Sequence, residues 1–155
     1  MTDKDDLAVV GCDIIDSNLY MVLGTAGDDG EPWVSPVYFA PEDYRLFYWV
    51  SAPEATHSRN LVARPQVSIV VFNSQVPIGT GQGVYMSAAA EELTGSDLDR
   101  AIDVYSRRAM EHGGRAFTIS DLQPPAPYRM YRATASEHWV LDPAASPNQR
   151  TPVAP

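Results

Sequence analysis

The spacing of strand-like segments is the feature that most constrains how this chain can fold. Apolar or alternating runs are separated by short turn-forming stretches such as residues 27–30 (GDDG), where glycine supplies a positive φ. Strands that follow one another at hairpin-like spacing predict a mainly β fold with helical additions. A small barrel and an open antiparallel sheet both satisfy this pattern. The six expected strands cover residues 18–26, 31–40, 44–51, 66–72, 83–93 and 128–141.

Helices are expected at three places along the chain. Apolar residues recur at helical spacing in residues 6–16 and in residues 96–112, which are followed by two glycines. A shorter helix is expected within residues 52–64, because Pro65 disfavours its continuation. Residues 143–155 are rich in Pro, Ala, Ser and Asn, as mobile chain ends often are. The sequence therefore predicts one domain over residues 1–142 and a flexible C-terminal tail over residues 143–155.

The composition argues against several classes of function. The formal net charge is -9, from 20 acidic and 11 basic residues, so a general nucleic-acid or anionic-membrane binder is not expected. No apolar run approaches about 18 residues, and the acidic N-terminus lacks the order of a signal peptide, so we expect no membrane span and a cytoplasmic location. One cysteine and three scattered histidines predict neither an intramolecular disulfide nor a metal site.

The linker between the third and fourth expected strands is a candidate phosphate site. Ser51 and Glu54 have the spacing of a capping box, which marks the start of a helix. A helix N-terminus offers free N–H groups and the positive end of a dipole, both of which suit a phosphate. Residues 56–59 (THSR) follow at once with hydroxyls, an imidazole and a guanidinium. The alternative is a surface helix with ordinary polar residues.

Several motifs, taken in order, resemble the pyridoxamine 5'-phosphate oxidase-like family of flavin-binding split β-barrels. They occupy residues 23–25 (LGT), 30–37 (GEPWVSPV), 46–49 (LFYW), 56–61 (THSRNL), 64–68 (RPQVS), 83–86 (GVYM) and 90–92 (AEE). The resemblance covers residues 18–94 well and the C-terminal third loosely. It implies a six-stranded split β-barrel that forms a homodimer, with FMN at the interface between the two chains.

The same resemblance carries cofactor contacts onto particular positions. The strand along the flavin ring matches Val34, Ser35 and Val37, and the strand end beneath the ring matches Trp49, Val50 and Ser51. The phosphate-binding linker matches Thr56, His57, Ser58 and Arg59, where His57 replaces a family lysine. Gln82 matches a polar cofactor contact, and Trp139 matches a group from the partner chain. For Val34, Val37, Trp49 and Trp139, packing in the core is the alternative role.

The resemblance implies an FMN-dependent oxidoreductase that acts on a small molecule. No nucleophile–base constellation emerges, and flavin chemistry needs none, because the ring carries the electrons. Oxidation of pyridoxamine phosphate itself is not expected, since the substrate-phosphate arginine motif has no match after Asp142. Two alternatives stay open: a deazaflavin-dependent reductase, and a non-catalytic protein that binds flavin or haem on the same barrel.

Overall fold

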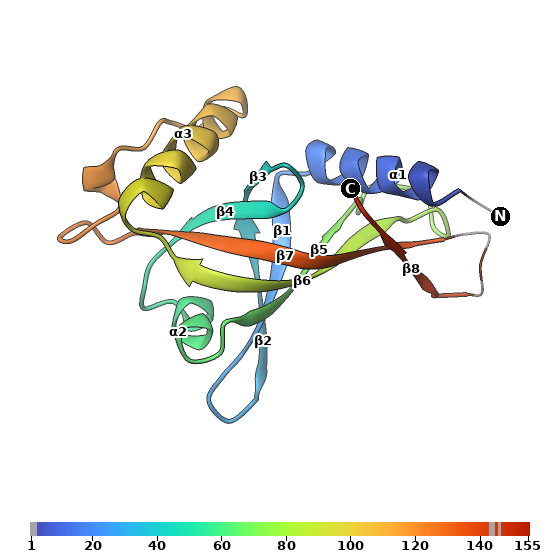
Figure 1. Ribbon diagram of the computed structural model, residues 1–155, viewed down its shortest axis with the longest axis horizontal. Coiled ribbons are helices and arrows are strands. Elements are labelled where there is room, and N and C mark those ends of the chain that lie inside the picture. The colour runs from blue at the N-terminus through green and yellow to red at the C-terminus, as the bar shows by residue number, and fades with distance from the viewer. Residues whose placement is uncertain (1–2, 143–144, 146) are drawn as a thin grey trace.

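The computed structural model describes residues 3–142, 145 and 147–155. Its strands form one curled antiparallel sheet in the order β2-β1-β5-β6-β7-β4-β3, and β8 pairs with the end of β7 (Figure 1). The strands are β1 (Tyr20–Ala26), β2 (Pro32–Tyr38), β3 (Ala40–Glu42), β4 (Leu46–Ser51), β5 (Gln66–Phe72), β6 (Gly83–Glu92), β7 (Arg129–Leu141) and β8 (Arg150–Val153). The helices are α1 (Lys4–Ser17), α2 (Thr56–Ala63) and α3 (Gly95–Glu111), with a 3-10 turn η1 (Ile119–Asp121).

All six expected strands and all three expected helices are present, and the fold class is mainly β as predicted. The count of six strands is wrong, because β3 and β8 add to it. β3 has only three residues and contains Pro41, so it carries little strand signal. β8 lies in the segment expected to be a flexible tail, yet residues 150–153 pair with residues 138–141 of β7. Pro152 is tolerated there because β8 is a short strand at the margin of the sheet.

The main core lies inside the curl of the sheet and under α1. Met21 and Leu23 of β1 point into it and are fully buried, as are Phe47 and Trp49 of β4. Ile15 of α1 closes the same cluster. Because strand residues alternate between faces, these burials decide which side chains remain on the outer face.

A second core joins α3 to β3, β4 and the start of β7. Leu98, Ile102 and Tyr105 supply the apolar stripe of α3 and pack near Tyr48. Arg108, also on α3, donates hydrogen bonds to the carbonyl oxygens of Phe39 and Asn18. These bonds fix α3 against the residues just before β1 and just after β2.

The outer face of the sheet remains accessible and partly apolar. Tyr20 of β1, Val34 of β2 and Phe72 of β5 are 61%, 68% and 47% exposed. Pro36 also lies on this exposed edge strand, where the missing N–H breaks no central ladder. Within the described residues, no helix is long and apolar enough to cross a membrane.

Candidate ligand site on the outer sheet face

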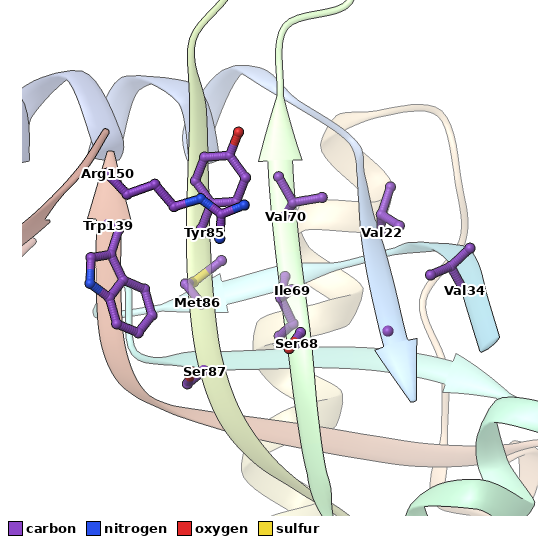
Figure 2. A pocket seen from close by; sticks show the side chains of 11 residues that line it. Val22, Val34, Ser68, Ile69, Val70, Tyr85, Met86, Ser87, Trp139 and Arg150 are labelled. Carbon is purple, nitrogen blue, oxygen red and sulfur yellow. The ribbon is translucent and has the colours of Figure 1, made fainter. Parts of the chain in front are cut away.

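A hollow of about 460 Å³ lies on the outer face of β1, β5 and β6 (Figure 2). Alternation places most of its side chains there, whereas Ile69 and Met86 border the hollow from the main core. A wider recess of about 760 Å³ continues it towards β2 and shares Gly24, Val34, Ser68 and Ser87. We call the first of these the outer-face hollow; it is lined by Val22, Gly24, Val34, Ser68, Ile69, Val70, Tyr85, Met86, Ser87, Trp139 and Arg150.

The chemistry of the outer-face hollow suits a flat, partly apolar ligand with polar edges. Valine side chains form an apolar floor, and Tyr85 and Trp139 add aromatic surface. Arg150 reaches from β8 across Tyr85, with its guanidinium carbon 3.7 Å from the ring centroid (Figure 2). Ser68 and Ser87 supply hydroxyls. A planar ring can rest on this floor while its heteroatoms meet the serines and the guanidinium.

Gly24 keeps the floor of the hollow open. A Cβ at this position would lie 3.3 Å from the Ser68 carbonyl oxygen and 3.9 Å from Val34 Cγ1. A larger side chain would therefore crowd β5 and occupy the hollow between β1 and β2. Glycine within a strand commonly marks such a close approach of backbone and ligand.

The start of α2 differs from the expected capping box. Ser51 is still part of β4, and a turn closed by Ala55 N–H donating to the Ala52 carbonyl separates it from the helix. The N-cap is Ala55, which makes no side-chain cap hydrogen bond. The Ser51 hydroxyl instead lies 2.9 Å from His57 Nε2. The capping-box prediction was wrong because α2 begins only at Thr56, and four residues separate it from the end of β4.

The environment of His57 disfavours the charged form of its imidazole. The residue is half-buried, and burial lowers the pKa of its imidazole below the ordinary value. The exposed cation of the same helix is Arg59. Arg64 follows α2 and donates from Nη2 to the Asp28 carbonyl oxygen at 3.0 Å, which ties the helix end to the β1–β2 turn. Asn60 strengthens this link by donating to Thr25 Oγ1 at 3.0 Å.

The residues predicted to contact a cofactor are spread over several environments. Val34 and Trp139 line the outer-face hollow, and Ser35 lies beside it on β2, accepting a hydrogen bond from Trp33 Nε1. Val37 and Trp49 belong to the main core, which is the alternative role that the sequence left open. On β4, Val50 packs against the second core, and Ser51 contacts His57. On α2, Thr56 is the first residue, Ser58 is buried and Arg59 is exposed. Gln82 lines a separate recess near Leu141.

Sequence reasoning did not assign four polar or aromatic residues of the outer-face hollow to the site: Ser68, Tyr85, Ser87 and Arg150. Ser68, Tyr85 and Ser87 could have been found from strand alternation, because each has apolar, inward-facing neighbours. Gly24 was quoted only as part of a motif. Arg150 gave no signal, since its segment was expected to be flexible and its contact with Tyr85 depends on the pairing of β8 with β7.

The family model for pyridoxamine 5'-phosphate oxidase matches residues 13–142. The chain belongs to this family. The match spans β1 to β7, so it confirms the resemblance inferred from the motifs. It also includes the C-terminal third, which the motifs matched only loosely. No curated protein matches the sequence.

Solved structures share the fold at low sequence identity. The heme binding protein from Mycobacterium smegmatis aligns with a TM-score of 0.73 and 15% identity, over 99% of this chain and 58% of that protein. HutZ, a heme storage protein from Vibrio cholerae, aligns with a TM-score of 0.66 and 19% identity, over 84% of this chain and 89% of that one. An FAD-binding protein from Mesorhizobium loti aligns with a TM-score of 0.62 and 23% identity, over 86% and 92%. At these identities the likeness shows the fold alone.

Proposed function

We propose that this family member is a homodimeric flavoprotein oxidoreductase that binds FMN in the outer-face hollow and acts on a small molecule. The observation that carries the proposal is the composition of that hollow. It combines an apolar floor, two aromatic side chains, two serine hydroxyls and one guanidinium around a strand glycine. These groups fit an isoalloxazine ring, whose flat body is apolar and whose edges carry oxygen and nitrogen atoms.

The side chains of the hollow favour flavin over haem. Haem iron needs an axial ligand, most often histidine. None of the three histidines lines the hollow, and Nε2 atoms of His57 and His138 contact Ser51 Oγ and the Tyr44 carbonyl oxygen. Met86 is 2% exposed, and the Tyr85 ring lies under Arg150. A flavin asks only for stacking and hydrogen bonds, which the hollow offers.

A bound flavin would supply the transfer of two electrons, and the chain would bind and orient it. Val34 and Val70 would support the ring, and Arg150 would stabilise negative charge at its edge. Arg59 would attract the phosphate from α2, in place of a protonated His57. Because FMN carries its phosphate at the end of a flexible chain, ring and phosphate contacts can come from different elements.

A second copy of the chain would complete the site by covering the outer face. Tyr20, Val34 and Phe72 leave an apolar surface exposed around the hollow, and burying such residues favours association. The chain mass is 17.0 kDa. Light scattering at micromolar concentration should therefore report twice that mass, and a monomer that binds flavin at full affinity would contradict the shared site.

Titration with FMN tests the proposed function. Binding should quench flavin fluorescence and leave one flavin per chain after gel filtration. Haemin and a deazaflavin are titrated in parallel, with Tyr85→Phe as a control for ligation of haem iron by that hydroxyl. Haemin binding with a sharp Soret band and no FMN binding would refute the flavin assignment. Preference for the deazaflavin would keep the site and change the cofactor.

A further inference from the structure

A second pocket, of about 410 Å³, lies between α3, the segment after it and the start of the β1–β2 ladder. Its walls include four aromatic side chains, Tyr20, Tyr38, Tyr105 and Phe117, and we call it the aromatic pocket. Its volume falls within the range of small-molecule sites. The pocket shares no lining residue with the outer-face hollow.

The four aromatic rings form a continuous edge-to-face chain. The centroids of Tyr20 and Tyr38 are 6.0 Å apart at 78°, those of Tyr38 and Tyr105 are 5.5 Å apart at 86°, and those of Tyr105 and Phe117 are 5.5 Å apart at 72°. This geometry is favourable for aromatic pairs and holds each ring in place. The pocket therefore offers fixed aromatic walls to a further ring.

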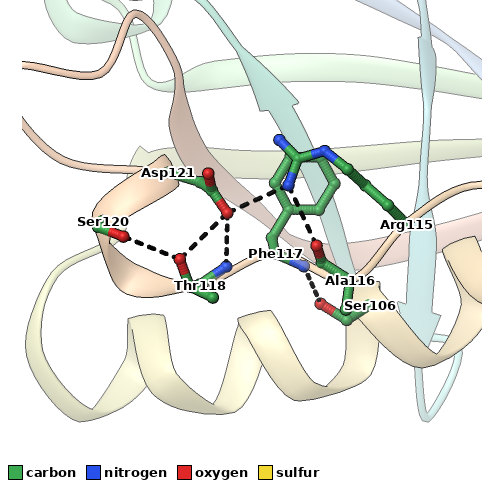
Figure 3. A network of polar contacts seen from close by, with 7 residues as sticks. All are labelled: Ser106, Arg115, Ala116, Phe117, Thr118, Ser120 and Asp121. Atoms are coloured by element: carbon green, nitrogen blue, oxygen red, sulfur yellow. Dashed lines mark hydrogen bonds and ion pairs between the residues drawn. The ribbon is translucent and has the colours of Figure 1, made fainter.

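The segment that carries Phe117 is held by a network of polar contacts (Figure 3). The Phe117 N–H donates to Ser106 Oγ on α3 at 2.9 Å, and the Thr118 N–H donates to Asp121 Oδ2 at 2.8 Å. Arg115 also donates to Asp121, at 3.2 Å, and lies 4.2 Å from the centroid of the Phe117 ring. The wall is thus braced against α3, and the Arg115 charge already has a carboxylate partner.

The Tyr38 hydroxyl is the unused polar group of this pocket. Its oxygen is buried and has no hydrogen-bond partner among the described residues. Burial raises the pKa of Tyr38, so the hydroxyl keeps its proton and can donate it. Arg108 lies 5.8 Å from the Tyr38 ring, but its guanidinium donates to two backbone carbonyls. A neutral ligand with an acceptor atom suits these groups better than an anion.

We propose that the aromatic pocket binds a small neutral aromatic molecule that presents a hydrogen-bond acceptor, such as a carbonyl oxygen, to the Tyr38 hydroxyl. The ligand ring would pack against the aromatic walls, and its acceptor would satisfy a buried donor that the protein leaves without a partner. Such a donor favours a ligand that carries an acceptor, because only that ligand gives the hydroxyl a partner.

The register of β1 and β2 places this ligand beside the outer-face hollow. Tyr20 pairs with Tyr38, and Gly24 pairs with Val34, four residues along the same two strands. Residues an even number apart point to the same face, so both pockets open on one side of the ladder, about 13 Å apart at roughly 3.3 Å per residue. At this separation the ligand would not contact a flavin ring in the hollow, so the aromatic pocket is a separate binding site that does not depend on the proposed function.

The test compares acetophenone with isopropylbenzene, which has a similar shape but no acceptor. Both are titrated without flavin into the wild-type protein, Tyr38→Phe and Tyr85→Phe, following backbone amide signals of Gly113 and Phe117 by NMR. Acetophenone should bind more tightly than isopropylbenzene to the wild type. Tyr38→Phe should weaken acetophenone about 2- to 12-fold and leave isopropylbenzene unchanged, and Tyr85→Phe should change neither.

Equal losses for both molecules in Tyr38→Phe, or no binding of either to the wild type, would overturn the proposal. Tyr38→Phe removes a hydroxyl without a partner, so unchanged thermal unfolding shows that the variant is folded. FMN is titrated separately into the same proteins. Failure of FMN to bind, with acetophenone behaving as expected, would refute the proposed cofactor and support the aromatic pocket.

Discussion

Comparing Arg150→Met with Arg59→Met would show which cation serves the flavin ring and which serves the phosphate. Methionine keeps an unbranched stem of similar bulk and removes the charge. Arg150 lies within the outer-face hollow, across the Tyr85 ring. Arg59 is exposed on α2, outside that hollow. We therefore expect Arg150→Met to weaken FMN and riboflavin alike, and Arg59→Met to weaken FMN alone, because only FMN carries a phosphate.

The size of each effect follows from the exposure of the two side chains. A hydrogen bond to a charged group typically contributes about 1.5–3 kcal/mol. Both arginines are exposed in the single chain, so solvent competes for them and the lower end applies. A loss of about 1.5 kcal/mol of binding free energy corresponds to roughly a 10-fold higher dissociation constant. Losing the Arg150 contact with Tyr85 affects the free and bound protein together, so it adds little to this difference.

Quenching of flavin fluorescence gives both dissociation constants for each variant. The informative quantity is the ratio of the FMN constant to the riboflavin constant, which should rise about 10-fold in Arg59→Met and stay constant in Arg150→Met. The assay is repeated at higher salt, which should reduce the phosphate effect more than the ring effect. If Arg150→Met changes the ratio and Arg59→Met does not, the assignment of the two cations is reversed and our reasoning from the hollow fails.

Two further predictions concern the folded state. Burial lowers the pKa of His57, so the unfolded chain binds a proton at this imidazole more readily than the folded chain does. The stability that neutral His57 contributes is therefore present above the unfolded pKa of about 6.5, and it is lost as the pH falls through the lower folded pKa. Urea unfolding of the wild type and His57→Gln should therefore show a difference in stability that shifts against the wild type below about pH 6.5, and a difference constant from pH 8 to 5 would exclude this linkage. Phe47 is fully buried in the main core, so Phe47→Ala should cost about 3–5 kcal/mol of unfolding free energy, whereas the exposed Val9→Ala should stay within about 0.5 kcal/mol; similar midpoints for the two variants would contradict the core assignment.

Sequence periodicity predicted most of the fold, because the apolar residues that it marks are largely those that the structure buries. The strand over residues 66–72 is mostly apolar, and the structure buries three alternate residues of it, Val67, Ile69 and Val71. The stripe of α3 was readable because Leu98, Ile102, Tyr105 and Ala109 recur at helical spacing. The two strands that escaped prediction, β3 and β8, are short and contain proline, so they offered too few residues for a periodic signal. Each pairs with the strand next to it in sequence, β3 with β4 and β8 with the end of β7.

The site was harder to predict because its residues depend on which face of each strand is buried. Trp49 and Val34 both matched cofactor positions, yet Trp49 is 0% exposed and Val34 is 68% exposed. A family match places a residue on a strand, but only the tertiary packing decides which of the strand's faces is covered. A one-residue change of register would reverse these assignments.

The contact between Arg150 and Tyr85 shows what no local pattern could have supplied. β6 and β7 shift register between Ser87 and Ala88, and only beyond that bulge does Trp139 come opposite Tyr85. β8 then pairs with the end of β7, which sets Pro152 opposite Trp139 and carries Arg150 over the Tyr85 ring. Each step depends on the pairing before it. The cation at the ring edge of the proposed cofactor site, Arg150, thus follows from the topology of the sheet.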